Sequence, residues 1–153
     1  MSIKKPMLII GLCILFTGCA TTSRAPADNI QGPTESSTDV GMRYLAGQGV
    51  PQDDAKAFYY LSKGAAEDDP FAENELGYMY AAGKGTPRDD EKALNYYQQA
   101  ADHGLASAQY NLGLMYLHGR GTPPNKALAM QWFQKAAAHG FEPAKVALAQ
   151  NHI

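Results

Sequence analysis

The chain has 153 residues, enough for one modest folded domain. Hydrophobic residues make up 45% of it and charged residues 18%, a balance typical of a folded protein rather than a disordered one. Lys and Arg number 13 against 15 Asp and Glu, which gives a formal net charge of −2. Because the chain has no basic excess with which to neutralise phosphates, nucleic acid is not expected as a partner.

The first 18 residues are expected to be a signal peptide. Two lysines precede an apolar run at residues 7–17, which is shorter than the roughly 20 residues that span a bilayer as a helix. The sequence at residues 15–19, LFTGC, resembles the lipobox of bacterial lipoproteins. This resemblance implies that a diacylglyceryl group is attached to Cys19, and that cleavage leaves this cysteine as the first residue. Because Ala20 rather than Asp follows, it also implies an outer-membrane location facing the periplasm.

The segment after the lipobox differs in composition from the rest of the chain. Residues 19–35 are rich in Thr, Ala and Pro and show little apolar periodicity, so we expect a flexible tether behind the lipidated cysteine. Cys13 and Cys19 are the two cysteines of the sequence. The body of the protein can therefore form neither an internal disulfide nor a thiolate metal site.

From residue 36 onward, the sequence repeats with a step of 36 residues. The residues that recur in this register are Gly41, Gly77 and Gly113; Tyr44, Tyr80 and Tyr116; Gly49, Gly85 and Gly121; and Pro51, Pro87 and Pro123. The step predicts three repeats, at residues 36–71, 72–107 and 108–143. Residues 144–153 read as the first helix of an unfinished fourth unit, and we expect them to form a capping helix over the third repeat.

Each repeat is predicted to contain two helices. In the middle repeat, Leu76 and Met79 follow helical spacing, and the sequence GKGTP at residues 83–87 then ends the first helix. Asp89 is expected to cap the second helix by accepting hydrogen bonds from the free amides of its first turn. The second helix is expected to turn Ala93, Tyr96, Tyr97 and Ala100 inward. A side chain at Gly77 should clash with the paired helix, at a cost of roughly 1–3 kcal/mol.

These repeats resemble the Sel-one-like repeat (SLR) family, a relative of the tetratricopeptide repeats. The second repeat carries LGYMY, GKGTP, DDEKA and YYQQAA, and the third carries LGLMY, GRGTP and WFQKAA. The resemblance covers about residues 36–143 and implies an all-α fold, a right-handed α/α solenoid of helix-turn-helix repeats like the tetratricopeptide superhelix. A single hairpin cannot bury its apolar face alone, whereas stacked hairpins can.

The same resemblance places the first helix of each repeat on a concave face. The predicted contact residues form two ladders along it: Thr38, Asn74, Tyr110 and Val146 in one, and Met42, Tyr78, Leu114 and Gln150 in the other, with Leu117 and His118 at the rim. Exposed Tyr, Met and Leu side chains are typical of a protein-binding surface. The expected partner is therefore another protein or a peptide, with the membrane reached through the lipid.

Catalytic interpretations have less support. The acid pairs at residues 53–54 and 89–90 could suggest acid–base chemistry, but they recur at predicted helix N-termini, where capping and the helix dipole explain them. His103 and His139 recur before a glycine at predicted helix C-termini. The sequence contains no H-E-x-x-H and no G-x-S-x-G. We therefore expect no catalytic residues, no metal site and no cofactor.

Three functions follow from these observations, in decreasing order of support. The first is a membrane-anchored adaptor or scaffold of the bacterial cell envelope. The second is a periplasmic immunity protein that sequesters a secreted toxic effector such as a phospholipase, a role that some small SLR proteins have. The third is a cell-wall-active enzyme.

Overall fold

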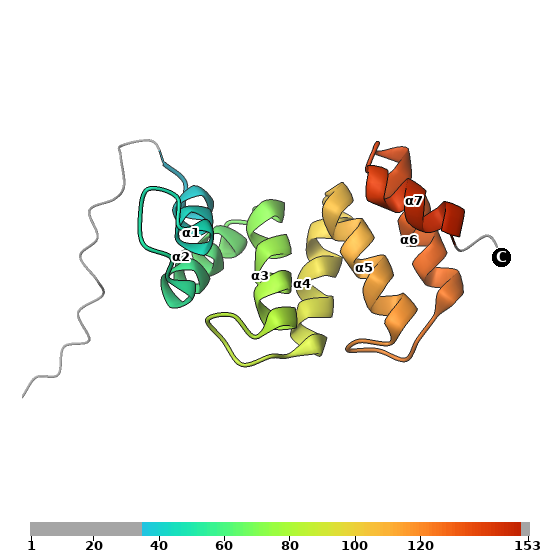
Figure 1. Cartoon of the computed structure of the whole chain (residues 1–153), viewed down its shortest axis with the longest axis horizontal. Coiled ribbons are helices and arrows are strands. Elements are labelled where there is room, and N and C mark those ends of the chain that lie inside the picture. The colour runs from blue at the N-terminus through green and yellow to red at the C-terminus, as the bar shows by residue number, and fades with distance from the viewer. Residues whose placement is uncertain (1–34, 151–153) are drawn as a thin grey trace, which may run out of the picture.

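The computed structural model describes residues 35–150, and within this range the chain forms seven helices and no strand. The helices are α1 (Ser37–Ala46), α2 (Asp54–Ala66), α3 (Pro70–Ala82), α4 (Asp90–Asp102), α5 (Ala106–His118), α6 (Lys126–Ala138) and α7 (Glu142–Gln150) (Figure 1). The predicted signal peptide, Cys19, all of the predicted tether except residue 35, and residues 151–153 lie outside the described residues.

Polar side chains determine where the second helix of each repeat begins. The side chains of Asp53, Asp89 and Asn125 each accept a hydrogen bond of 3.0 Å from the backbone amide three residues later. This confirms the predicted capping role of Asp89. Helices α3 and α5 begin at residues 70 and 106, two residues before the predicted repeat boundaries at 72 and 108.

A glycine in the first helix of each repeat lies under a large side chain of the second helix. A Cβ atom added at Gly77 would lie 2.7 Å from the ring of Tyr97, and one at Gly113 would lie 2.6 Å from the ring of Phe133. Leu61 occupies the equivalent place over the first repeat's glycine, Gly41. The predicted clash at Gly77 is thus confirmed, and the pairing lets the two helices of a hairpin approach closely.

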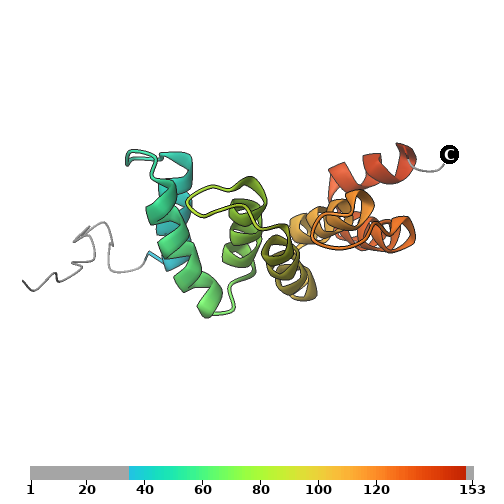
Figure 2. The ribbon, with the colours of Figure 1, turned by 90° about the horizontal axis from the view of Figure 1, so that it is seen from below.

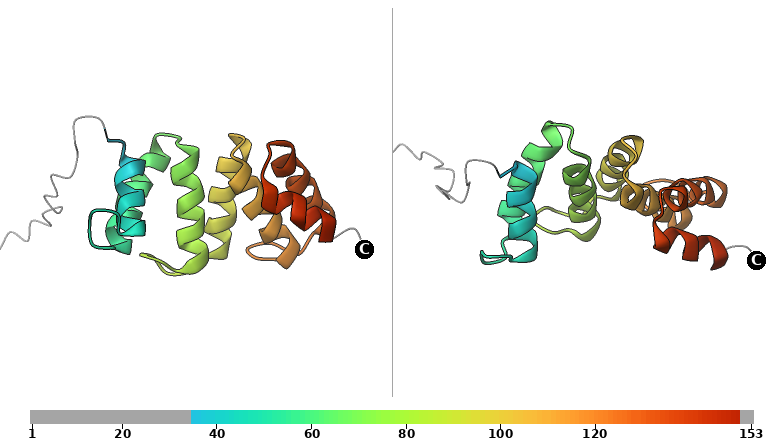
Figure 3. Two further views of the ribbon diagram at one scale, coloured as in Figure 1. Left: turned by 45° about the horizontal axis from the view of Figure 1, so that its top comes forward. Right: turned by 90° about the horizontal axis from the view of Figure 1, so that it is seen from above.

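The hairpins stack into an open array. The principal contacts of each helix are with the helices that precede and follow it in the chain, so α1 and α7 stand at opposite ends (Figure 1). Views from below and from above agree that the ends do not fold back on each other (Figures 2 and 3). The protein is therefore an all-α repeat solenoid, as predicted. Its largest fully buried side chains are Phe133, Leu61, Leu76, Met79, Leu112 and Val40.

The loop inside the third repeat joins it to the second. The Arg120 guanidinium donates hydrogen bonds to the Ala81 carbonyl (2.9 Å) and to Asp90 (2.7 Å). Hydrogen bonds from Arg88 and Arg120 lower the pKa of Asp90 to about 2. Next to this contact, Gly121 has a φ of +68° and its Cα lies so close to the Asp90 carbonyl that a Cβ atom would clash with it.

This packing predicts that Gly121→Ala destabilises the protein more than Gly49→Ala, the equivalent change in the first repeat. Both glycines have a left-handed φ, so each substitution should cost roughly 1–2 kcal/mol in backbone strain. At Gly49 the nearest atom to an added Cβ is the flexible end of Arg43, 3.5 Å away. At Gly121 the backbone clash should add about 1–3 kcal/mol. Urea unfolding of both variants measures the difference, and equal losses would contradict this account of the junction.

Candidate functional site

The first-helix ladder is only partly on the surface. Its exposed members are Met42, Tyr78, His118, Val146 and Gln150; Tyr110, Leu114 and Leu117 are half-buried; Thr38 and Asn74 are buried. Tyr110 is committed to packing, because its ring centroid lies 5.4 Å from those of Phe133 and Phe141. The positions that remain accessible to a partner are therefore fewer than the register predicts.

Thr38 and Asn74 join repeats together instead of facing solvent. The Thr38 hydroxyl donates a 2.6 Å hydrogen bond to Asp69, at the start of the next repeat's first helix. Asn74 accepts a 3.1 Å hydrogen bond from Asn111 of the third repeat. Their assignment as surface contacts is wrong, because both side chains are buried and hydrogen-bonded to residues of the next helical hairpin.

Tyr78 is a large aromatic side chain that this face leaves exposed, and Phe71, seven residues earlier on α3, is another. Tyr78 is 39% accessible to solvent, and the Lys84 ammonium lies 5.4 Å from the centroid of its ring. On the same side of the array, a small cavity of about 140 Å³ is lined by residues that include Leu114, His118 and Arg120. An exposed ring and a half-buried apolar hollow on one face are features that a polypeptide partner can contact.

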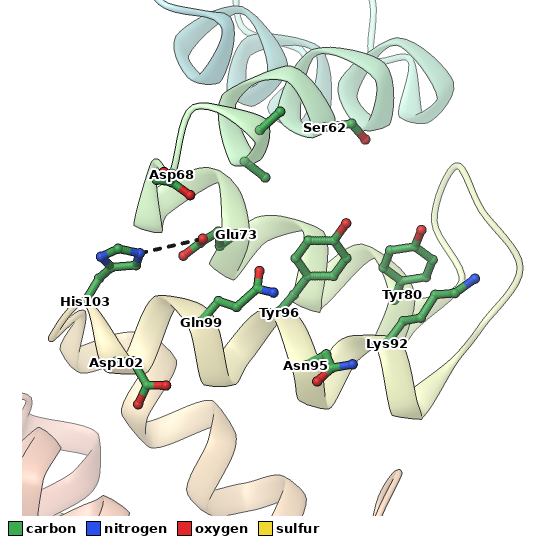
Figure 4. Close-up of a pocket in the computed structure, with 12 residues that line it drawn as sticks. Ser62, Asp68, Glu73, Tyr80, Lys92, Asn95, Tyr96, Gln99, Asp102 and His103 are labelled. Carbon is green, nitrogen blue, oxygen red and sulfur yellow. Dashed lines mark ion pairs between the residues drawn. The ribbon is translucent and has the colours of Figure 1, made fainter.

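A larger groove lies on the other side of α3 and was not anticipated from the sequence. It has a volume of about 810 Å³ and is lined by α2, the turn after it, α3 and α4 (Figure 4). Glu73 and Tyr80 are seven residues apart and so share one stripe of α3, on the side away from Tyr78. The groove is acidic at one end and aromatic at the other.

The aromatic end is built from residues that recur in the repeat. The rings of Tyr80 and Tyr96 stack with centroids 5.6 Å apart and planes 9° from parallel. The ring of Phe58 meets Tyr80 edge-on at 5.5 Å, and the Lys92 ammonium lies 5.3 Å from the centroid of Tyr80. Burial raises the pKa of Tyr96, so its hydroxyl stays protonated near neutral pH.

Glu73 stands at the acidic end. Its side chain is only 4% exposed, and its Oε1 lies 3.8 Å from Nε2 of His103, whose own side chain is 46% exposed. Glu73 Oε2 is buried and has no hydrogen-bond partner in the protein. Burial raises the pKa of Glu73, and the nearby Asp68 and Asp69 raise it further, while His103 acts in the opposite direction. Figure 4 shows Glu73 joined to the His103 ring by the dashed line, with Asp68 nearby.

The equivalent position of the third repeat shows what Glu73 lacks. Gln109 occupies it and is buried at 4% exposure. Its side-chain nitrogen donates to the Ala101 carbonyl (3.3 Å), and its oxygen accepts from His139 Nδ1 (3.1 Å). A carboxylate cannot donate, so an ionised Glu73 cannot reproduce this pair of hydrogen bonds.

Two further properties bear on the kinds of function available. Among residues 35–150, no three His, Cys, Asp or Glu side chains are placed so that they could hold a metal ion. In the same part of the chain, no helix is both long enough and apolar enough to cross a membrane.

Comparison with known families identifies the repeats. The Sel1 repeat matches at residues 34–69, 70–105 and 106–141, which together make up most of the chain. The chain belongs to the Sel1 repeat family. Sel1 repeat proteins are generally protein–protein interaction modules and typically non-enzymatic scaffolds. Among curated protein sequences, none matches the chain significantly.

Solved structures of Sel1 repeat proteins resemble this one. A Sel1 repeat protein from Oxalobacter formigenes is 39% identical, with a TM-score of 0.67, over 74% of this chain and 86% of that one. The protein c5321, a protective antigen present in uropathogenic Escherichia coli strains, is 36% identical with a TM-score of 0.66, over 68% of this chain and 22% of its own. Cysteine-rich protein B of Helicobacter pylori is 27% identical with a TM-score of 0.64, over 73% and 88%.

The contrast between Glu73 and Gln109 predicts that Glu73→Gln stabilises this Sel1 repeat protein. At about pH 7 the gain should be roughly 1 kcal/mol, because the amide can satisfy buried hydrogen-bonding groups that the carboxylate leaves unpaired. The raised pKa means that folding favours protonated Glu73. Its unfavourable contribution is therefore full above that pKa and fades as pH falls towards the ordinary value of a glutamate.

Thermal or urea unfolding at about pH 7 and about pH 4 measures this effect. The gain from Glu73→Gln should shrink at the lower pH. Glu91→Gln, a change at an exposed residue in the first turn of α4, serves as the control and should give no such gain. A stabilisation of equal size at both pH values would contradict the raised pKa of Glu73.

Proposed function

We propose that the chain is a protein-binding scaffold of the bacterial cell envelope, held at the outer membrane by acyl chains on Cys19. The observation that carries the binding role is the open stack of three Sel1 repeats, which leaves side chains exposed along the first helices. Support for the anchor comes from the LFTGC sequence that ends at Cys19 and the short apolar run before it. Acyl chains contribute about 0.8 kcal/mol per buried methylene, so several together anchor firmly.

The contact surface proposed here is the exposed part of the first-helix face. Tyr78 presents an aromatic ring there, and Leu114 and His118 line the adjoining 140 Å³ cavity. Interface affinity concentrates in a few aromatic and apolar side chains near the centre of the contact. The middle of the array, between the first and third repeats, is therefore where a partner is expected to gain most of its binding energy.

The catalytic alternative finds little support in the acid pairs. Asp53 and Asp89 accept hydrogen bonds from the first-turn amides of α2 and α4, and Asp90 is bound by two arginines. These hydrogen bonds lower the pKa of Asp89 and Asp90, so both stay deprotonated and are poor proton donors. Their recurrence in the repeat is accounted for by helix capping.

Binding through the first-helix face predicts that Tyr78→Ala weakens partner binding at least tenfold, because the ring supplies buried contact area. Tyr59→Ala is a matched control: Tyr59 is 46% exposed on the second helix of the first repeat and likewise lies beneath a lysine, at 5.3 Å. The mature protein is used to capture envelope proteins, and each variant's affinity for the captured partner is measured. Equal affinity of the Tyr78→Ala and unsubstituted proteins would reject this contact surface.

The anchor predicts a separate result in cells. Cys19→Ala should abolish incorporation of a fatty-acid probe and release the protein from the membrane fraction, because the thiol is the attachment point. Cys13→Ala lies within the apolar run and should leave labelling intact. Labelling that persists in the Cys19→Ala protein would show that the anchor is wrongly assigned, and would leave the binding surface untouched.

A further inference from the structure

The acidic end of the groove is specific to one pair of neighbouring repeats. Three carboxylates line it, against the single lysine at the aromatic end. In the other full repeats the equivalent residues are uncharged: Gly104 and Gly140 for Asp68, Ser37 and Gln109 for Glu73, and Ala66 and Ala138 for Asp102. Gln99 also stands where those repeats have Lys63 and Lys135. The excess of negative charge is thus a departure from the repeat at four positions.

Two of these departures act against stability. Asp68 has a φ of 57°, and it is the one residue other than glycine with a positive φ among residues 35–150. Left-handed backbone is less favourable for an aspartate than for the glycines at the equivalent positions, which adopt it readily. Glu73 leaves a buried carboxylate oxygen without a hydrogen bond, whereas the side-chain nitrogen and oxygen of Gln109 each have a partner. Neither residue is explained by the needs of the fold.

We propose that the acidic end of this groove binds the cationic side chain of an arginine or lysine from a polypeptide partner. The guanidinium or ammonium group donates to Glu73 Oε2, and the nearby Asp68 adds to the negative charge that attracts it. The His103 ring, half-exposed and 3.8 Å from Glu73, is a loose cover that the incoming group displaces. This inference rests on the proposed function, because it takes the cationic side chain to come from a protein partner.

The rest of the groove favours a peptide over a metal ion. None of the described His, Cys, Asp and Glu side chains gather as a metal site. A volume of about 810 Å³ exceeds what one side chain needs, and the stacked rings of Tyr80 and Tyr96 offer a surface for a neighbouring residue. Lys92 at that end disfavours a second positive charge nearby and favours a neutral or acidic one.

The test uses Nα-acetyl-arginine amide as the probe and its citrulline counterpart, which has a similar shape and no charge. Each is titrated into the full-length, isotopically labelled chain while backbone amide resonances are followed. The arginine probe should shift the amides of Asp68, Glu73, Gln99 and His103, and the citrulline probe should not. Glu73→Gln should weaken arginine binding at least tenfold and Asp68→Gly severalfold, although both variants are expected to fold more stably than the parent.

Glu142→Gln on α7, far from the groove, is the control and should bind the probe like the unsubstituted chain. Equal shifts with arginine and citrulline, or full binding by Glu73→Gln, would overturn the proposal. Shifts at the same amides on dilution of the protein alone would mean that a second copy fills the groove, and would overturn the assignment to a different partner. If the arginine probe does not bind but Tyr78→Ala still weakens partner binding, this proposal is wrong and the proposed function still holds.

Discussion

The close approach of the two helices in each repeat is the constraint on which the rest of the structure depends. At Gly77 the absence of a side chain lets the ring of Tyr97 lie directly on the helix backbone, and Phe133 does the same at Gly113. Because the pair recurs every 36 residues, each hairpin has a similar geometry and stacks on the next in a similar way. Regular stacking of this kind extends the array and keeps it open.

Polar contacts join one repeat to the next, and they determine which surface positions remain free. Thr38 with Asp69 (the cap of α3), Asn74 with Asn111, and Arg120 with Asp90 each join one helical hairpin to the next. A side chain engaged in this way is withdrawn from the face on which helical spacing places it. The surface available for binding therefore consists of side chains that take no part in these contacts. It is concentrated around Tyr78 on one side of α3 and around Glu73 on the other.

The sequence predicts the helices and their caps because both depend on local spacing. Leu76 and Met79 follow the helical period, and Asp89 precedes its helix as a cap must, so the fold and the repeat register could be predicted. The burial of Thr38 and Asn74 could not be predicted, because helical spacing indicates which way a side chain points around the helix but not what packs against it. The groove was missed because Glu73 and His103 are thirty residues apart. The repeat register did contain a signal: His103 recurs as His139, whereas Glu73 is replaced by Gln109.

The position of that change within the array is itself informative. In a solenoid, stability is approximately a sum of repeat and junction contributions, and the end repeats have a neighbour on one side only. The junction between the first and middle repeats has helices packed on both sides, so a strained turn at Asp68 and an unpaired carboxylate at Glu73 can be accommodated where α2, α3 and α4 meet. The same two features at an outer end of the array would favour fraying. Specialised chemistry in this protein is therefore expected at the centre of the stack, with the more regular repeat chemistry of Gln109 and His139 beside it.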